Sequence, residues 1–153
     1  MTNKAKLLFD GSSLKWEEGG DVVKEWPAMS GKKDFQSSEY TCVPDAGPIP
    51  EGKWHVRQEN HQSADFIDHA LGFLGMGKWP GGYSSWGDDR IWLEPDKKTN
   101  TQGRTNLSIH GGNDPGSRGC IDLAGGMSNF VSYFDSHGED MDLIVKYPEW
   151  FYD

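Results

Sequence analysis

Cysteine is scarce in this sequence. The 153 residues include two, Cys42 and Cys120. Two cysteines are too few for the disulfide framework of a small secreted domain, and they do not form the paired spacing of a zinc site. One bridge between them stays open as a structural use of both residues. His55, His61 and His69 have no cysteine or carboxylate at ligand spacing, so we expect them to be structural or exposed and expect no metal site.

Clusters of basic residues are also missing. The chain carries 24 acidic and 15 basic side chains, for a formal net charge of −9. Nucleic acids and anionic membrane surfaces are bound by clustered Lys and Arg, so neither is an expected partner. No segment has the roughly 20 apolar residues that a membrane-spanning helix needs. The apolar run near the N-terminus is too short for the core of a signal peptide.

Glycine and aromatic residues are plentiful. The sequence has 20 Gly, seven Trp, seven Phe and five Tyr. Large aromatic side chains fill a core from few positions, which suits a thin β core with long loops. The length fits one domain over residues 1–153, and no repeat or linker divides it. The composition therefore favours a single, mainly β domain.

Turn residues and alternating apolar positions divide the chain into short strands followed by one helix. We expect a β meander in the first half, and we expect Gly138 to end the helix. The last strand should be central or nearly so in the sheet. The expected strands cover 5–10, 14–18, 22–30, 52–59, 90–95, 104–111 and 141–148, and the helix covers 127–138.

A long segment between 60 and 89 has little periodicity and many glycines and aromatics. Long loops inside compact domains are often functional. Trp79, Tyr83 and Trp86 would form a lid over a peptide groove, or would instead cover a small core. The charged residues that follow, Asp88, Asp89 and Arg90, are expected to be a solvated charge group.

The stretch "SIHGGNDPGSRGCIDL", residues 108–123, places His110 and Cys120 ten positions apart across a Gly-rich loop. A cysteine becomes a good nucleophile as its thiolate, which needs a neighbouring base or positive charge. The loop is long enough to bring Cys120 back to the His110 imidazole. Gly119 would let the backbone present the Gly119 and Cys120 amides to a developing oxyanion.

Charged residues around this loop would have opposite effects on a Cys120 thiolate. Arg118 would favour a thiolate, whereas Asp114 and Asp122 would oppose it. A Gly-rich turn that holds a His and a Cys by chance also explains the pattern. His137 is the only downstream histidine after Cys120. Because it lies at the end of the expected helix, where His often interacts with the helix dipole, it ranks below His110 as a base.

Three blocks of sequence carry a family resemblance. "IHGG…SRGCIDL" resembles the signature of L,D-transpeptidases of the YkuD type. "GPIPEGKWHV", residues 47–56, is similar to the turn and strand of that family, and "MSGK", residues 29–32, sits where its Ser/Thr-Gly-Lys strand end does. The resemblance covers about residues 6–147. The family has His in place of Arg118, Arg in place of Asp122 and a longer loop between the two key residues.

The short loop and the missing signal sequence resemble instead the L,D-transpeptidase-like and L,D-carboxypeptidase toxin effectors of type VI secretion. The resemblance implies a β-sandwich or barrel with one main helix after the cysteine. It also implies synthesis in the bacterial cytoplasm, delivery by a secretion apparatus, action in the periplasm of a target cell and a cognate immunity protein. No organic cofactor is implied.

The resemblance also assigns residues. Cys120 would attack the L-centre carbonyl of a peptidoglycan tetrapeptide stem, and His110 would be the base. Gly111 would orient the imidazole through its carbonyl, while Gly119 and Cys120 would hold the oxyanion. Ser117 and Arg118 would stabilise the loop or lie near substrate. The outcome would be release of D-alanine or its exchange for another D-amino acid. A non-catalytic wall-binding domain and a different cysteine peptidase or amidase of peptidoglycan remain alternatives.

Overall fold

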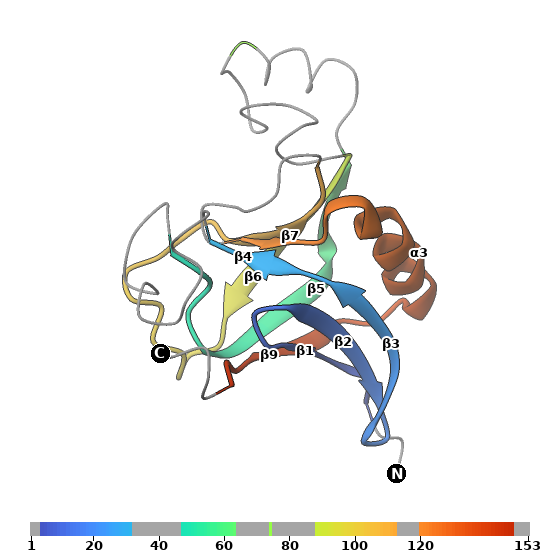
Figure 1. The fold of residues 1–153 in the computed structure, drawn as a ribbon, viewed down its shortest axis with the longest axis horizontal. Helices are drawn as coiled ribbons and strands as arrows, with labels where there is room; N and C mark the ends of the chain where they lie inside the picture. The colour runs from blue at the N-terminus through green and yellow to red at the C-terminus, as the bar shows by residue number, and fades with distance from the viewer. Residues whose placement is uncertain (1–3, 32–46, 64–73, 75–87, 113–119, 149–153) are drawn as a thin grey trace.

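β-Strands are the main regular structure in the computed structural model, which describes residues 4–31, 47–63, 74, 88–112 and 120–148. Figure 1 shows the strands curving around a common core, with α3 along one side. The strands are β1 (Lys6–Phe9), β2 (Ser13–Glu18), β3 (Asp21–Pro27), β4 (Met29–Ser30), β5 (Gly52–Ser63), β6 (Asp89–Pro95), β7 (Ser108–His110), β8 (Ile121–Asp122) and β9 (Met141–Val145). A 3-10 turn η2 (Ala124–Gly126) leads into the helix α3 (Met127–His137).

One sheet contains all nine of these strands, in the order β3-β2-β1-β9-β5-β6-β7-β8-β4. Its two edge strands, β3 and β4, are separated along the chain by Ala28 alone. Since neighbouring residues are 3.8 Å apart, the sheet has to curl until its edges meet. The result is a nearly closed barrel, which confirms the predicted mainly β fold.

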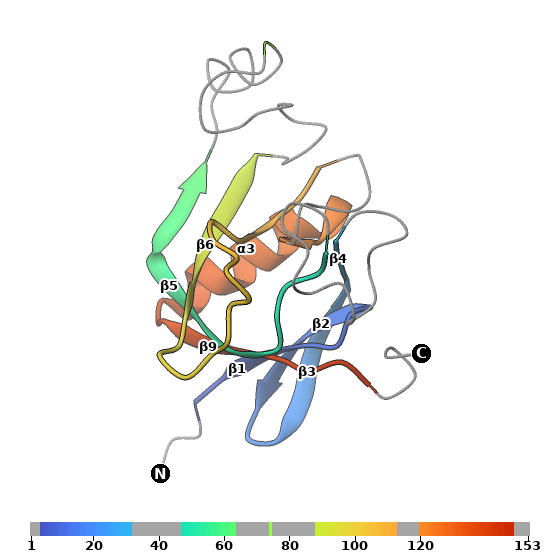
Figure 2. The same ribbon diagram turned by 90° about the vertical axis from the view of Figure 1, so that its left-hand side faces the viewer.

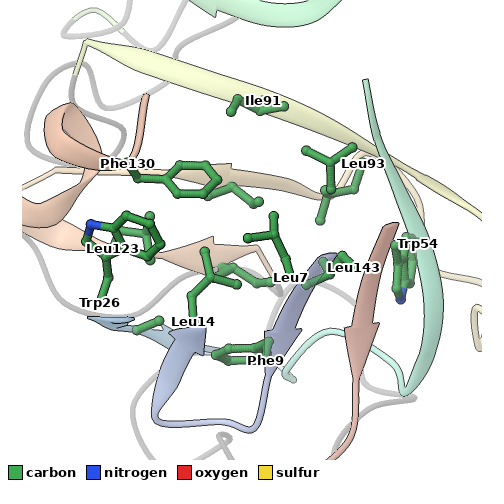
Figure 3. Packing of buried hydrophobic residues seen from close by; sticks show 14 of the residues in the cluster. Leu7, Phe9, Leu14, Trp26, Trp54, Ile91, Leu93, Leu123, Phe130 and Leu143 are labelled. Atoms are coloured by element: carbon green, nitrogen blue, oxygen red, sulfur yellow. The ribbon is translucent and has the colours of Figure 1, made fainter. Parts of the chain in front are cut away.

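The core lies inside this curled sheet, where alternate residues of each strand point inward. On β1, Leu7 and Phe9 are buried and Lys6 is exposed. On β9, Leu143 and Val145 are buried and Ile144 between them is partly exposed. Figure 3 shows Leu7, Phe9 and Leu143 among side chains of β2, β5 and β6 and Phe130 of α3. The buried aromatic residues are those expected from the composition, including Trp16, Trp26, Trp54, Phe130 and Phe134.

The predicted helix is confirmed over residues 127–137. Its buried side chains, Met127, Phe130, Val131 and Phe134, recur at helical spacing. Phe130 makes edge-on ring contacts with Trp16 of β2 and Trp26 of β3. Gly138 ends the helix with φ of 72°, in the left-handed conformation that glycine adopts without strain.

Several strand boundaries differ from the prediction. The expected strand 22–30 is divided at Ala28, whose N–H donates to Ser12 O at the end of the β2–β3 register, and Met29 and Ser30 then pair with β8. The strand expected at 52–59 runs on to Ser63, with an irregularity in its pairing with β6 between Val56 and His61. The strand expected at 104–111 is reduced to Ser108–His110. The last strand is nearly central, as predicted, between β1 and β5.

Candidate active site

The candidate site lies where β7 and β8 pair in parallel. His110 aligns with Asp122 and Ile109 with Ile121. Continuing this register places Cys120, just before β8, opposite Ser108. Because side chains alternate between faces, Ser108, His110, Cys120 and Asp122 share one face. The spacing of strands and residues puts the His110 and Cys120 backbones about 8 Å apart, the separation of diagonal neighbours on one face of a sheet.

His110 is held in one orientation. Its Nδ1 lies 2.7 Å from the Gly111 carbonyl oxygen. A carbonyl only accepts, so Nδ1 carries the proton and donates it, leaving Nε2 with the lone pair of a base. Burial lowers the pKa of the His110 imidazole from 6.5 to about 4, the Gly111 carbonyl opposes this, and Arg90 lowers it further. His110 is therefore neutral at neutral pH.

Cys120 is buried next to Ser108. Its side chain and backbone are 3% exposed. The Ser108 backbone N–H donates to Cys120 Sγ at 3.3 Å, and the Ser108 hydroxyl lies 3.5 Å from the same sulfur. The sulfur thus has two donors aimed at it from β7. Such donors favour a sulfur that carries negative charge.

Arg90 corrects the expectation of a solvated charge group at 88–90. It is 4% exposed and lies opposite His110 in the β6–β7 pairing. Its Nε donates to Ser108 Oγ at 3.1 Å, and its guanidinium also hydrogen-bonds the Cys120 side chain. Asp88 is exposed as expected. Asp89, by contrast, forms an ion pair with His61 at 2.8 Å.

Neighbouring atoms leave no room for a side chain at Gly111. A Cβ there would come within 2.8 Å of Met127 Cβ and 2.9 Å of the Ala124 carbonyl oxygen. The start of α3 and η2 therefore press directly on the residue whose carbonyl orients His110. Ala124 itself has a positive φ of 47°, which is uncommon for a residue with a Cβ.

The described parts of the three sequence blocks meet at this site. Ser30 of the "MSGK" block pairs with Ile121 across β4 and β8. Its hydroxyl accepts from the Ile49 N–H at 2.9 Å, which ties in the "GPIPEGKWHV" block. Buried Arg104 donates to the carbonyls of Gly47 and Pro48. The blocks are far apart in the sequence and contiguous in the fold, as expected for one site.

Asp122 follows Cys120 by two residues and is almost fully buried. Its Oδ1 accepts from the Ala124 N–H at 2.7 Å, while the Leu123 N–H donates to the His110 carbonyl at 2.8 Å. These bonds fix the chain as it leaves β8 and turns into η2. Asp122 therefore holds the backbone that connects the cysteine to the helix.

Other predicted residues lie elsewhere. His137 packs edge-on against Trp16, with ring centroids 5.1 Å apart, at the far end of α3. Eleven helical residues span about 16 Å, so His137 is remote from the Met127 end of α3 that touches Gly111. His55 lies between Asp96 and Asp142, and His61 lies between Asp89 and Asp135. Both have the structural role expected of them.

Several predictions fall outside the described residues. They concern the oxyanion glycine Gly119, the loop residues Asp114, Ser117 and Arg118, the lid residues Trp79, Tyr83 and Trp86, and Cys42 and His69. Sequence reasoning missed Ser108 and Arg90. Ser108 has a signal, since it lies two residues before His110 on the same strand face. Within the described ranges, no group of three or more His, Cys, Asp or Glu is arranged to hold a metal ion.

Within the described part of the chain, no helix is both long and apolar enough to cross a membrane.

Comparison with solved structures shows an L,D-transpeptidase-like fold. The chain is similar to L,D-transpeptidase 1 of Mycobacterium tuberculosis, with 15% identity and a TM-score of 0.50 over 94% of this chain and 62% of that one. It is also similar to an L,D-transpeptidase from Xylanimonas cellulosilytica, with 18% identity and a TM-score of 0.50 over 95% and 62% of the two chains. This chain thus spans less than two thirds of either structure. No curated protein matches it.

A family model matches residues 24–142, which contain β4 to β8, α3 and the whole described site. This match and the fold confirm the resemblance drawn from the three sequence blocks. The chain belongs to the Tlde1 domain family.

Proposed function

We propose that this protein is a cysteine-dependent enzyme that modifies peptidoglycan by cleaving the L,D bond of tetrapeptide stems. The observation that carries the proposal is the shared face of β7 and β8. There, the hydrogen bond from Nδ1 to the Gly111 carbonyl fixes His110 in the tautomer whose basic nitrogen is Nε2, and two Ser108 donors point at the Cys120 sulfur. Membership of the Tlde1 domain family and the L,D-transpeptidase-like fold support the same function.

Acylation of Cys120 begins the proposed reaction. His110 Nε2 takes the proton of the Cys120 thiol as the sulfur attacks the L-centre carbonyl of the stem. A C–S bond forms, and the carbonyl π electrons move to the oxygen. The Gly119 and Cys120 amides are the proposed donors to that oxyanion. Collapse breaks the C–N bond to D-alanine, and the leaving amine takes the proton back from His110.

The second half resolves the thioester. His110 is neutral again and removes a proton from the incoming nucleophile, which attacks the same carbonyl. Water gives an L,D-carboxypeptidase, whereas the amine of a D-amino acid gives exchange. The C–S bond then breaks, and the Cys120 thiolate that is released recovers its proton from His110. The hydrogen bond from Nδ1 to the Gly111 carbonyl would keep the imidazole in one tautomer and orientation through both halves.

The biological setting is proposed on the family alone. As a Tlde1 domain protein, the chain would act as an antibacterial effector delivered by a type VI secretion apparatus. Its substrate would lie in the periplasm of the target cell, and a cognate immunity protein would protect the producer.

Purified tetrapeptide muropeptides test the reaction. Wild type, Cys120→Ala, His110→Ala and His137→Ala are incubated with them, with and without D-methionine, and products are read by mass spectrometry. We expect loss or replacement of D-alanine with the wild type and His137→Ala, and none with the other two. His137→Ala is the matched control because it removes a histidine packed away from the site.

Two results would reject the proposal. The first is full activity of Cys120→Ala, which would exclude a thiol nucleophile. The second is no product from folded wild type on stems of any length. Retention of that wild type on intact sacculi would then favour a wall-binding domain.

A further inference from the structure

We propose that Arg90 is a positioning residue that holds the Cys120 sulfur through Ser108 and balances the negative charge that develops on it. The proposal rests on the proposed role of Cys120 as nucleophile. It adds a third element, strand β6, to a site otherwise built from β7 and the chain around β8.

A short chain of contacts connects the two residues. Arg90 Nε donates to Ser108 Oγ at 3.1 Å, and that hydroxyl lies 3.5 Å from Cys120 Sγ. The hydroxyl can therefore accept from the guanidinium and donate to the sulfur at once. The Arg90 guanidinium also hydrogen-bonds the Cys120 side chain directly. Ser108 places its backbone N–H on the same sulfur at 3.3 Å.

The guanidinium is fixed as well as close. It stacks on Trp92, two residues further along β6, at 4.0 Å from the ring centroid. Trp92 pairs with Ser108 across β6 and β7, so the aromatic platform lies beside the hydroxyl that Arg90 contacts. Planar stacking and a forked donor set are properties that arginine has and lysine lacks. The strand register thus aims Arg90 across β7 toward Cys120.

Burial gives this arrangement its electrostatic meaning. Taking a guanidinium out of water is costly unless an anion lies beside it. Burial lowers the pKa of the Arg90 guanidinium, and its interaction with Cys120 raises it. The charged and titratable groups that face Cys120 from the strands around it are Arg90 on β6, His110 on β7 and Asp122 on β8. Of these, Arg90 carries the permanent positive charge.

His110 cannot take over this role in the resting site. Burial lowers the pKa of its imidazole to about 4, so no imidazolium is present at neutral pH to balance a thiolate. The two tasks are therefore divided. His110 receives the proton as sulfur attacks, and Arg90 stabilises the charge that the proton leaves behind.

Alkylation of Cys120 by iodoacetamide tests the proposal without a substrate. All variants carry Cys42→Ser so that the reaction reports Cys120 alone. We expect Arg90→Gln to raise the pH of half-maximal alkylation by about one unit, because it removes a positive charge within hydrogen-bonding distance. Arg90→Lys should keep the alkylation midpoint close to that of the wild type, since it keeps the charge. Ser108→Ala should give a smaller shift, because its backbone N–H still reaches the sulfur.

Arg104 provides the matched control. It is also a buried arginine, but its guanidinium binds the Gly47 and Pro48 carbonyls. Arg104→Lys should lower thermal stability and leave the alkylation midpoint unchanged. On muropeptides, Arg90→Gln should lower kcat at least tenfold with little change in KM. NMR titration of Arg90→Gln should also show a higher pKa for His110, because a neighbouring positive charge has been removed.

An unchanged alkylation midpoint in Arg90→Gln would overturn the proposal, as would an equal shift in Arg104→Lys. If Arg90→Gln does not fold, the decision rests on Ser108→Ala and on the His110 titration in Arg90→Lys. If Arg90→Gln shifts the alkylation midpoint but the wild type leaves muropeptides intact, the proposed role of Arg90 is kept and the proposed substrate is rejected. If folded wild type is not alkylated at any pH, Cys120 is not a reactive nucleophile, and the proposal is rejected.

Discussion

Acid should destabilise this protein through His110 at a pH well above the range in which carboxylates titrate. The folded state holds the imidazole with a pKa of about 4, whereas an unfolded histidine titrates near 6.5. Between these values the unfolded chain binds one more proton than the folded one. Stability is therefore fully present above pH 6.5 and falls as the pH drops toward 4.

The size of the effect follows from the two pKa values. Relative to pH 8, the loss from His110 is about 2 kcal/mol at pH 5 and reaches about 3 kcal/mol below pH 4. Losses of this size are a large part of the 5–15 kcal/mol that typically holds a domain folded. They arise because burial leaves an imidazolium without water.

Urea unfolding at pH 8 and pH 5 measures this loss. The comparison uses wild type, His110→Asn and His137→Asn, since the histidine at 137 packs on Trp16 away from the site. The free energy of unfolding should drop between the two pH values by about 2 kcal/mol more in wild type than in His110→Asn. His137→Asn should behave as wild type does. Equal drops in wild type and His110→Asn would refute the buried, neutral imidazole.

Three further substitutions test the packing around the site. Gly111→Ala should fold but lose at least tenfold in kcat, measured on muropeptides, because its Cβ meets Met127 and the Ala124 carbonyl and must move the carbonyl that orients His110. Phe130→Ala should lower the free energy of unfolding by about 3–5 kcal/mol in urea, since it empties a fully buried ring site. Gly138→Ala should cost about 1 kcal/mol in the same assay without changing kcat, because the strain of a positive φ falls at the end of α3 remote from Gly111.

The helix and most strands were predictable because each leaves a local pattern. Phe130, Val131 and Phe134 recur at helical spacing, and Gly138 marks the end. Residues of β1, β6 and β9 alternate between buried and less buried positions. The break at Ala28 had no such signal, since it depends on the sheet curling until β3 and β4 become its two edges.

The proposed nucleophile and base, Cys120 and His110, could be suggested from the sequence because they share one short block, whereas Arg90 could not. Along the sequence Arg90 follows Asp88 and Asp89, which is a typical solvent-facing pattern. Its place beside His110 and Ser108 comes from the pairing of β6 with β7, and this long-range register cannot be read from either strand alone. Ser108 could have been predicted to share a strand face with His110, because side chains alternate along a strand and the two residues are two positions apart. Its closeness to Cys120 required the parallel pairing of β7 and β8.

The place of β9 in the sheet has a consequence for how the chain is made. The last strand pairs with β1 on one side and with β5 on the other, so it joins the β1–β3 meander to the remaining strands. Every residue of the candidate site leaves the ribosome before β9 does. Until then the sheet is in two pieces, and Phe9 has no Val145 beside it. The site therefore assembles late, after synthesis of nearly the whole chain, and a high share of such distant pairings makes folding slow.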